Sequence, residues 1–129
     1  MPLVRIDLSK TQPKGLAQKV GDIIFQAMRD EINVPADDKF QIITHHDSDE
    51  LVRPKSYMGI EYSEGIIFIQ ITLSLGRSVD LKKKFYQRIA EDCHNKLGVR
   101  KEDLFIQLVA VVKENWSFGN GLAQYAEQD

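Results

Sequence analysis

The sequence predicts one α/β (α+β) domain of tandem β-α-β units, with a four-stranded sheet and two helices on one of its faces. The main observation is an internal repeat, in which residues 2–45 align without a gap onto residues 67–110. Each half reads as a strand, an amphipathic helix and a second strand, and a crossover of this length joins parallel strands with a right-handed connection. A chain of 129 residues with 43% hydrophobic residues can bury one such core, so we take residues 1–129 as a single domain.

We call two positions matched by this alignment repeat partners. The first unit consists of a strand, a helix and a second strand. A strand over 2–8 leads to a helix that we expect to begin at Thr11 as N-cap, with Pro13 in the first turn, and to stop before Pro35. Apolar residues fall at helical spacing between these limits: Leu16, Val20, Ile23, Ile24, Ala27 and Met28. A second strand is expected over 40–44.

The second unit repeats this order. A strand over 66–73 is followed by a helix with Ser78 as N-cap, Asp80 in its first turn and Gly98 at its end, and then by a strand over 105–112. Its apolar stripe consists of Leu81, Phe85, Ile89, Cys93 and Leu97. The lone cysteine lies on this stripe and cannot form an intrachain disulfide, so we expect it in the core.

Composition and charge exclude several classes of partner. The net charge is −2 and the pI about 5.9, without a basic patch, so we expect neither nucleic acid nor an anionic membrane surface as a partner. No segment approaches the roughly 20 apolar residues of a membrane span, and no cleavable leader is evident. We therefore expect a cytoplasmic protein.

One cluster has the composition of a metal site: His45, His46, Asp47, Asp49 and Glu50. Consecutive strand residues face opposite sides, so at most one of the two histidines can join any given site. Closed sites draw three or four convergent ligands, and no second His or Cys cluster is present. We interpret the cluster as a polar strand end that runs into a loop, and we expect neither a metal nor another cofactor.

Pro2 is the first candidate for chemistry. If Met1 is removed, Pro2 carries a free secondary amine, and an α-amino group titrates at about 7.7–8.0. Such a group could serve as a base or an acid near neutral pH. The ordinary alternative is a proline tolerated at the start of a strand.

Two further polar residues can converge on Pro2 through the geometry of the repeat. Arg77 lies at the strand-to-helix turn of the second unit, and Asp38 lies at the start of the strand that follows the first helix. An amine, a guanidinium and a carboxylate in one pocket suffice to bind a small oxo acid, since Arg grips a carboxylate bidentately and the other two exchange protons. The ordinary alternatives are a turn residue for Asp38 and a solvent-facing residue for Arg77.

Three stretches together resemble the tautomerase superfamily and, within it, the malonate semialdehyde decarboxylase-like group. They are residues 2–8, residues 34–41 and, above all, residues 115–121, with the sequence Asn-Trp-Ser-Phe-Gly-Asn-Gly. The resemblance covers nearly the whole chain and implies the tautomerase-like β-α-β fold.

The resemblance implies roles for individual residues. Pro2 is the catalytic amino-terminal proline, Asp38 works with it or with water, and Arg77 binds the substrate carboxylate. Trp116 and Phe118 line the apolar wall of the pocket. The family pattern has two arginines flanking a proline in the turn that here reads Leu75-Gly76-Arg77. Leu75 therefore takes the place of the first arginine and gives the substrate site an apolar side chain there.

The resemblance also implies an assembly. The run Ile66 to Ile71 is too continuous for a solvated sheet face, so we expect the face away from the helices to be apolar and covered. The family implies a homotrimer whose sheets face inward. The C-terminal segment, residues 113–129, would close the pocket and reach a neighbour.

The function implied is that of an enzyme in which Pro2 catalyses keto-enol tautomerisation of a small oxo carboxylic acid. The alternative is a carboxy-lyase or hydratase of the malonate semialdehyde decarboxylase type. A trimeric binding module is the non-enzyme alternative, which the missing arginine would suit.

Overall fold

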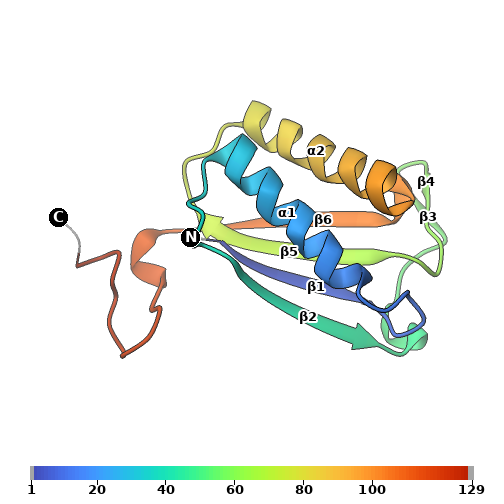
Figure 1. The fold of residues 1–129 in the computed structure, drawn as a ribbon, viewed down its shortest axis with the longest axis horizontal. Coiled ribbons are helices and arrows are strands. Elements are labelled where there is room, and N and C mark those ends of the chain that lie inside the picture. Colours follow the sequence, from blue (N-terminus) through green and yellow to red (C-terminus); the bar gives the residue numbers. More distant parts are fainter. Residues whose placement is uncertain (1, 128–129) are drawn as a thin grey trace.

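In the computed structural model, which describes residues 2–127, two helices cover one face of a four-stranded mixed sheet (Figure 1). The strands are β1 (Leu3–Ser9), β2 (Phe40–His46), β5 (Ile67–Ser74) and β6 (Leu104–Val111), in the spatial order β2-β1-β5-β6. The helices are α1 (Leu16–Ile32) and α2 (Val79–Leu97). β1 pairs parallel to β2 and β5 parallel to β6, while β1 and β5 are antiparallel, which confirms the predicted pair of β-α-β units.

The two parallel pairs share one register. Leu3 pairs with Phe40 in the first unit, and their repeat partners Phe68 and Phe105 pair in the second. The two units therefore present equivalent corners at opposite ends of the sheet, because β1 and β5 run in opposite directions.

The core lies between the sheet and the helices. Alternate residues of the central strands point into it: Val4, Ile6 and Leu8 from β1, and Ile67, Ile69, Ile71 and Leu73 from β5. Helix α2 contributes Phe85, Ile89 and Cys93, each fully buried. Burial raises the pKa of the Cys93 thiol to about 12, so this cysteine is a protonated core residue, as predicted.

The two helices begin differently. In α2, Ser78 Oγ accepts a hydrogen bond from Leu81 N at 3.2 Å, as predicted for the N-cap. In α1 the prediction was wrong, because Gly15 takes the N-cap position with a φ of 84°. Thr11 instead bonds Ser9 Oγ through both its backbone N–H and its hydroxyl. This local side-chain contact competes with helix capping, so the helix starts one turn later.

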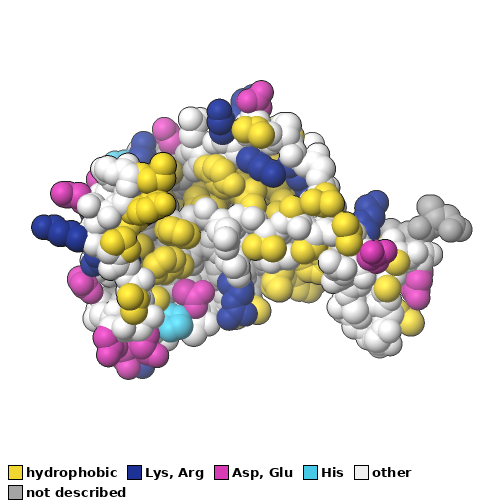
Figure 2. Space-filling view, turned by 180° about the vertical axis from the view of Figure 1, so that it is seen from behind, with side chains coloured by type: hydrophobic (Ala, Val, Ile, Leu, Met, Phe, Trp, Pro, Cys, Tyr) yellow, Lys and Arg dark blue, Asp and Glu magenta, His cyan; other side chains and the backbone are white. Residues whose placement is uncertain are grey.

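The face of the sheet away from the helices is mixed. Contrary to our expectation, the run Ile66 to Ile71 contributes only Phe68 to the apolar residues of this face, because Ile67, Ile69 and Ile71 belong to the core. Its apolar residues include Leu3, Phe40, Ile42, Phe68 and Phe105, and between them runs a polar row of Arg5, Gln70 and Gln107. Figure 2 shows this side of the molecule, where apolar patches alternate with charged and polar side chains.

Short elements connect and extend the sheet. Between β2 and β5 lie the 3-10 turn η1 (Ser48–Glu50) and a two-stranded hairpin of β3 (Ser56–Tyr57) and β4 (Ile60–Glu61). The turn η2 (Lys101–Asp103) precedes β6 and η3 (Lys113–Asn115) follows it. The C-terminal segment then projects from the end of the sheet where the N-terminus lies (Figure 1). Among residues 2–127, no helix combines the length and apolar composition that crossing a bilayer requires.

Candidate active site

Pro2 is buried immediately ahead of β1, a central strand of the sheet. Leu3 pairs with Phe40 on one side and with Thr72 on the other. Pro2 therefore lies between the beginning of β2 and the end of β5. The sequence folds this way because the apolar alternation of β1 continues back to Pro2, and proline is tolerated as the residue ahead of a strand.

Asp38 stands two residues before β2, at the same end of the sheet. A turn places it there, in which Asp38 N donates to Pro35 O at 3.1 Å. Its side chain is half-buried. Because β1 pairs with β2 from Leu3 and Phe40 onward, the turn that holds Asp38 lies at the end of the sheet where Pro2 lies.

The repeat partner of Asp38 shows what a closed version of this corner looks like. Asp103 is 2% exposed and accepts hydrogen bonds from Ser63 N at 2.8 Å and from Ser63 Oγ at 2.5 Å. Arg100 Nη1 lies 3.2 Å from both carboxylate oxygens. The chain that enters β5 therefore fills the second corner, whereas in the first corner Asp38 remains accessible.

Arg77 lies in the turn that ends β5, at the end of the sheet where Pro2 lies. Gly76 has a φ of 120°, and Arg77 Nη1 donates to Ser74 O at 2.6 Å. Leu75 N donates to Val111 O at 3.0 Å, while the Leu75 side chain is 58% exposed. Proline could not adopt this φ, so the Leu75-Gly76-Arg77 turn has a conformation that a turn with proline in the middle cannot share.

Two buried polar atoms lie close to these elements in the chain. Within the described part of the chain, Ser74 Oγ and Trp116 Nε1 are buried without a hydrogen-bond partner. Ser74 is the last residue of β5, and Trp116 follows η3. A buried polar group without a partner is costly, so both atoms are suited to bonding a ligand or water.

An aromatic cluster forms in the C-terminal segment. The rings of Trp116 and Phe118 stack with centroids 5.5 Å apart, and Tyr125 meets Phe118 edge-on at 4.8 Å. Gln124 holds the loop between Phe118 and Tyr125. Its Oε1 accepts a hydrogen bond from Phe118 N at 3.0 Å, and its Nε2 donates to Gly119 O at 2.9 Å. The two predicted wall residues are thus held together with a third aromatic side chain.

Tyr125 connects this cluster to the polar residues. Burial raises the pKa of its phenol, the negative charge of Asp38 raises it further, and the positive charge of Arg77 lowers it. All three groups therefore lie within electrostatic range of one another. Sequence reasoning missed Tyr125, although a third aromatic residue in the segment that holds Trp116 and Phe118 was a usable signal.

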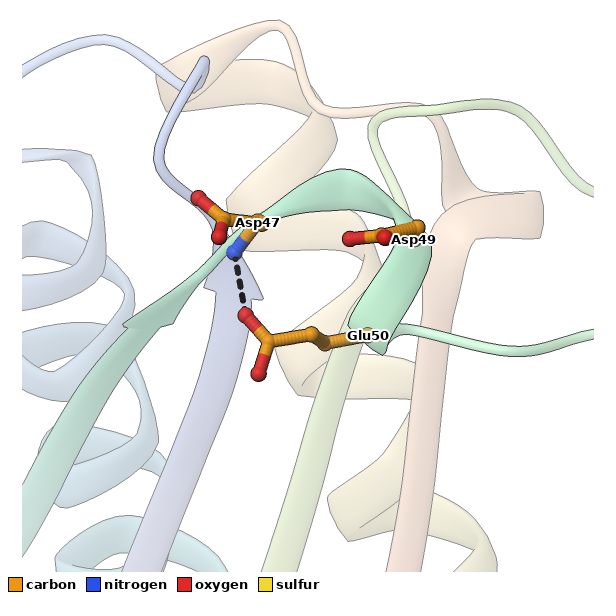
Figure 3. A group of neighbouring side chains, drawn as sticks. All are labelled: Asp47, Asp49 and Glu50. Atoms are coloured by element: carbon orange, nitrogen blue, oxygen red, sulfur yellow. Dashed lines mark hydrogen bonds between the residues drawn. The ribbon is translucent and has the colours of Figure 1, made fainter.

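The metal-like residues lie at the far end of β2. Asp47, Asp49 and Glu50 have carboxylate oxygens within 4.8 Å of one another and are exposed (Figure 3). Glu50 Oε1 accepts from Asp47 N at 3.0 Å, and Lys10 Nζ pairs with Asp47 at 3.1 Å. These contacts are those of a helix cap and a surface ion pair.

The two histidines point to opposite faces, as predicted. His45 is exposed, whereas His46 Nε2 lies 2.7 Å from Asp7 Oδ1 on the face of the sheet away from the helices. His46 is thus engaged with a neighbouring strand.

Two β-α-β units share one sheet, with a buried proline ahead of the first strand, a carboxylate in the turn before β2 and a cation in the turn after β5. These features are those of a tautomerase-type protein. The chain belongs to the tautomerase family: the family model described as tautomerase enzyme matches residues 38–119. The match contains Asp38, Arg77 and the Trp116–Phe118 stretch.

Relatives and solved structures agree with this assignment. The chain is 42% identical to the probable tautomerase YusQ of Bacillus subtilis (strain 168) over 98% of this chain and 100% of that protein. The crystal structure of FG41 malonate semialdehyde decarboxylase inhibited by 3-bromopropiolate has a TM-score of 0.88 and 30% identity, covering 96% of this chain and 94% of that one. A fused 4-OT symmetric trimer, at 18% identity and a TM-score of 0.75 over 98% and 99% of the two chains, shares the fold.

Proposed function

We propose that this enzyme of the tautomerase superfamily uses the amine of Pro2 for keto-enol tautomerisation of a small oxo carboxylic acid. The observation that carries the proposal is the location of Pro2: buried, with Asp38 in the turn before β2 and Arg77 in the turn after β5, the two strands that flank β1. Removal of Met1 is part of the proposal, because only then is the amine free.

Each residue has a defined part in the tautomerisation. The neutral Pro2 nitrogen takes a proton from the carbon next to the substrate carbonyl, and the protonated amine then delivers it to the enolate oxygen to give the enol. Ketonisation runs through the same steps in reverse. Arg77 holds the carboxylate and offsets the negative charge that develops on the enolate oxygen. Asp38 favours the protonated amine after the first transfer. Trp116, Phe118 and Leu75 supply an apolar wall that limits access of water.

A second candidate is decarboxylation, and the 30% identity to a malonate semialdehyde decarboxylase favours it. In that reaction a cationic Pro2 polarises the carbonyl, and the carboxylate held by Arg77 departs as carbon dioxide while the electron pair remains on the adjacent carbon. We place tautomerisation first because this corner has one arginine at the β5 turn. A single guanidinium can hold an enolisable oxo acid but fixes a short carboxylate less firmly for cleavage.

We further propose that the molecule is a homotrimer. The face away from the helices exposes Phe40 at 49%, Phe105 at 43% and Ile42 at 39%, which a second copy of the chain would cover. The fold is shared with fused 4-OT chains that form trimers. In this assembly the C-terminal segment, residues 113–129, would close the pocket and contact a neighbour.

A paired assay separates the two reactions. The untagged protein is given an enolpyruvate and, separately, malonate semialdehyde, with Pro2→Ala as a matched control that retains a primary amine. We expect ketonisation of the enolpyruvate to be the faster reaction and to fall strongly in Pro2→Ala. Faster loss of carbon dioxide from malonate semialdehyde would establish the second candidate instead, and inactivity toward both, in a protein that retains Met1, would favour a binding module.

A further inference from the structure

The two corners of the sheet share their backbone hydrogen bonds as well as their register. In the first unit Asp38 N donates to Pro35 O at 3.1 Å. In the second unit their repeat partners make the same contact, from Asp103 N to Arg100 O at 3.0 Å. The helix before each of these turns ends in a residue with the left-handed conformation. The surroundings of Asp103 therefore show which positions a group must take to meet Asp38.

Residues 63–66, the chain that enters β5, fill the second corner. Ser63 Oγ donates a hydrogen bond to Asp103 at 2.5 Å. Gly65 O accepts one from Gln12 Nε2 at 2.8 Å. This segment thus presents a hydroxyl to the carboxylate and a carbonyl oxygen to the side-chain amide. Because Ser63 Oγ lies 3.0 Å from Gly65 N, the hydroxyl oxygen and the carbonyl oxygen are at most roughly 7 Å apart.

The repeat partners of the groups around residues 63–66 surround Pro2. They are Asp38 for Asp103, Arg77 for Gln12, and Pro2 itself for Ile67. In the mature chain that begins at Pro2, as proposed above and as this inference requires, no residue corresponds at this offset to residues 63–66. A substrate at the first corner can therefore occupy the space that residues 63–66 occupy at the second.

Arg77 decides what one end of such a ligand must be. At the second corner the neutral amide of Gln12 meets the neutral carbonyl of Gly65. A guanidinium pairs instead with a carboxylate, through two parallel N–H bonds. Arg77 Nη1 also donates to Ser74 O at 2.6 Å, but a guanidinium has five N–H donors, so it retains capacity for a carboxylate.

Asp38 decides the other end. An ionised carboxylate only accepts hydrogen bonds, and at Asp103 the chain supplies two donors, the N–H and the hydroxyl of Ser63. A ligand with a hydroxyl group supplies a donor to Asp38 in the same way. A methyl group in that place would leave the half-buried carboxylate without this donor, which weakens binding.

We propose that the substrate of this site is a hydroxylated oxo acid, whose carboxylate binds Arg77 and whose hydroxyl, at the other end of the molecule, donates to Asp38. A chain of four carbon atoms with these groups at its ends spans roughly 6 Å, within the limit set by residues 63–65. The carbon chain lies against the Pro2 nitrogen, because this nitrogen takes the place of the amide that joins residues 66 and 67.

The test measures binding with two probes that differ in one group. 4-Hydroxy-2-oxobutanoate carries the hydroxyl, and 2-oxopentanoate has a methyl group of similar size in its place. Each is titrated into the untagged full-length protein and followed by the fluorescence of Trp116, the single tryptophan of the chain. The hydroxylated probe should bind at least about tenfold more tightly.

Two variants assign the two ends of the ligand. Asp38→Ala should remove the preference for the hydroxylated probe without weakening 2-oxopentanoate. Arg77→Ala should weaken both probes by a similar factor and keep the preference. Equal binding of the two probes by the unmodified protein, or a preference that survives Asp38→Ala, would overturn the proposal. The first of these outcomes needs no variant, so it decides the matter even if Asp38→Ala does not fold.

A form that retains Met1 separates this inference from the proposed chemistry. At the same offset Met1 corresponds to Ile66, so it should take part of the site and weaken both probes. Undiminished binding by this form would show that the probes bind elsewhere and would overturn the inference. Selective binding by a protein that begins at Pro2 but does not turn over an enolpyruvate would support the inference and contradict the chemistry of Pro2.

Discussion

Asp38 and Asp103 are repeat partners whose surroundings give them different roles. Asp103 is buried and accepts hydrogen bonds from Ser63 and Arg100, whereas Asp38 is half-buried beside the start of β1. The same position, ahead of the second strand of each unit, thus holds a carboxylate that is enclosed by its own chain in one unit and accessible in the other. The difference between the two carboxylates lies in their partners, because Ser63 and Arg100 enclose Asp103 whereas Asp38 remains half-buried.

This contrast predicts opposite effects of two matched substitutions. Asp103→Asn should lower the free energy of unfolding by roughly 1.5–3 kcal/mol, the scale of hydrogen bonds to a charged group, and leave the rate constant of the folded enzyme nearly unchanged. Asp38→Asn should reduce turnover with little loss of stability. Urea denaturation and steady-state kinetics on both variants check this, and a stability loss centred on Asp38 would contradict the assignment.

The phenol of Tyr125 reports on the charges around it without any assay of activity. Because Arg77 lowers its pKa and Asp38 raises it, Arg77→Ala should move the pKa of Tyr125 further up and Asp38→Asn should move it down. Tyr86, whose pKa is raised by burial alone, is the control and should move in neither variant. NMR titration of ring-labelled tyrosine measures all of these. An unchanged Tyr125 would show that the three groups do not share a corner.

At the level of elements, the turn between β5 and α2 positions the proposed carboxylate-binding group. Gly76 at a φ of 120° lets Arg77 fold back onto Ser74 O. Arg77→Ala should weaken capture of carboxylated substrates by roughly 1.5–3 kcal/mol in kcat/KM. Substrates with the same carbonyl but no carboxylate should be affected much less. Equal losses with both kinds would indicate that Arg77 maintains the turn and does not bind substrate.

The elements also show how far the sequence could lead. Helical spacing, Ser78 and Gly98 predicted α2 to within a residue at each end, because local capping decides those boundaries. The start of α1 was missed because Ser9 engages Thr11, a side-chain contact that spacing does not reveal. The membership of Tyr125 in the corner depends on the path of an irregular segment, which has no periodicity to read. The apolar run Ile66 to Ile71 misled us because its alternate residues enter the core.

For the whole molecule, the face away from the helices predicts association. We expect a trimer at micromolar concentration, measured by light scattering. Ile42→Glu, on the exposed part of this face, should shift the mass toward the monomer, because a charge would be buried in the interface. Lys83→Glu, on the exposed surface of α2, is the matched control and should leave the mass unchanged. A monomer mass for the unmodified protein throughout this range would contradict the assembly.

The proposed chemistry depends on one nitrogen atom, and its state can be measured directly. The untagged protein is weighed by mass spectrometry and assayed on an enolpyruvate, beside a form that retains one residue ahead of Pro2. We predict that the mature chain begins at Pro2 and is active, and that the extended form is inactive because an amide nitrogen has no basic lone pair. Full turnover by the extended form, shown by its mass to be intact after the assay, would contradict catalysis by Pro2.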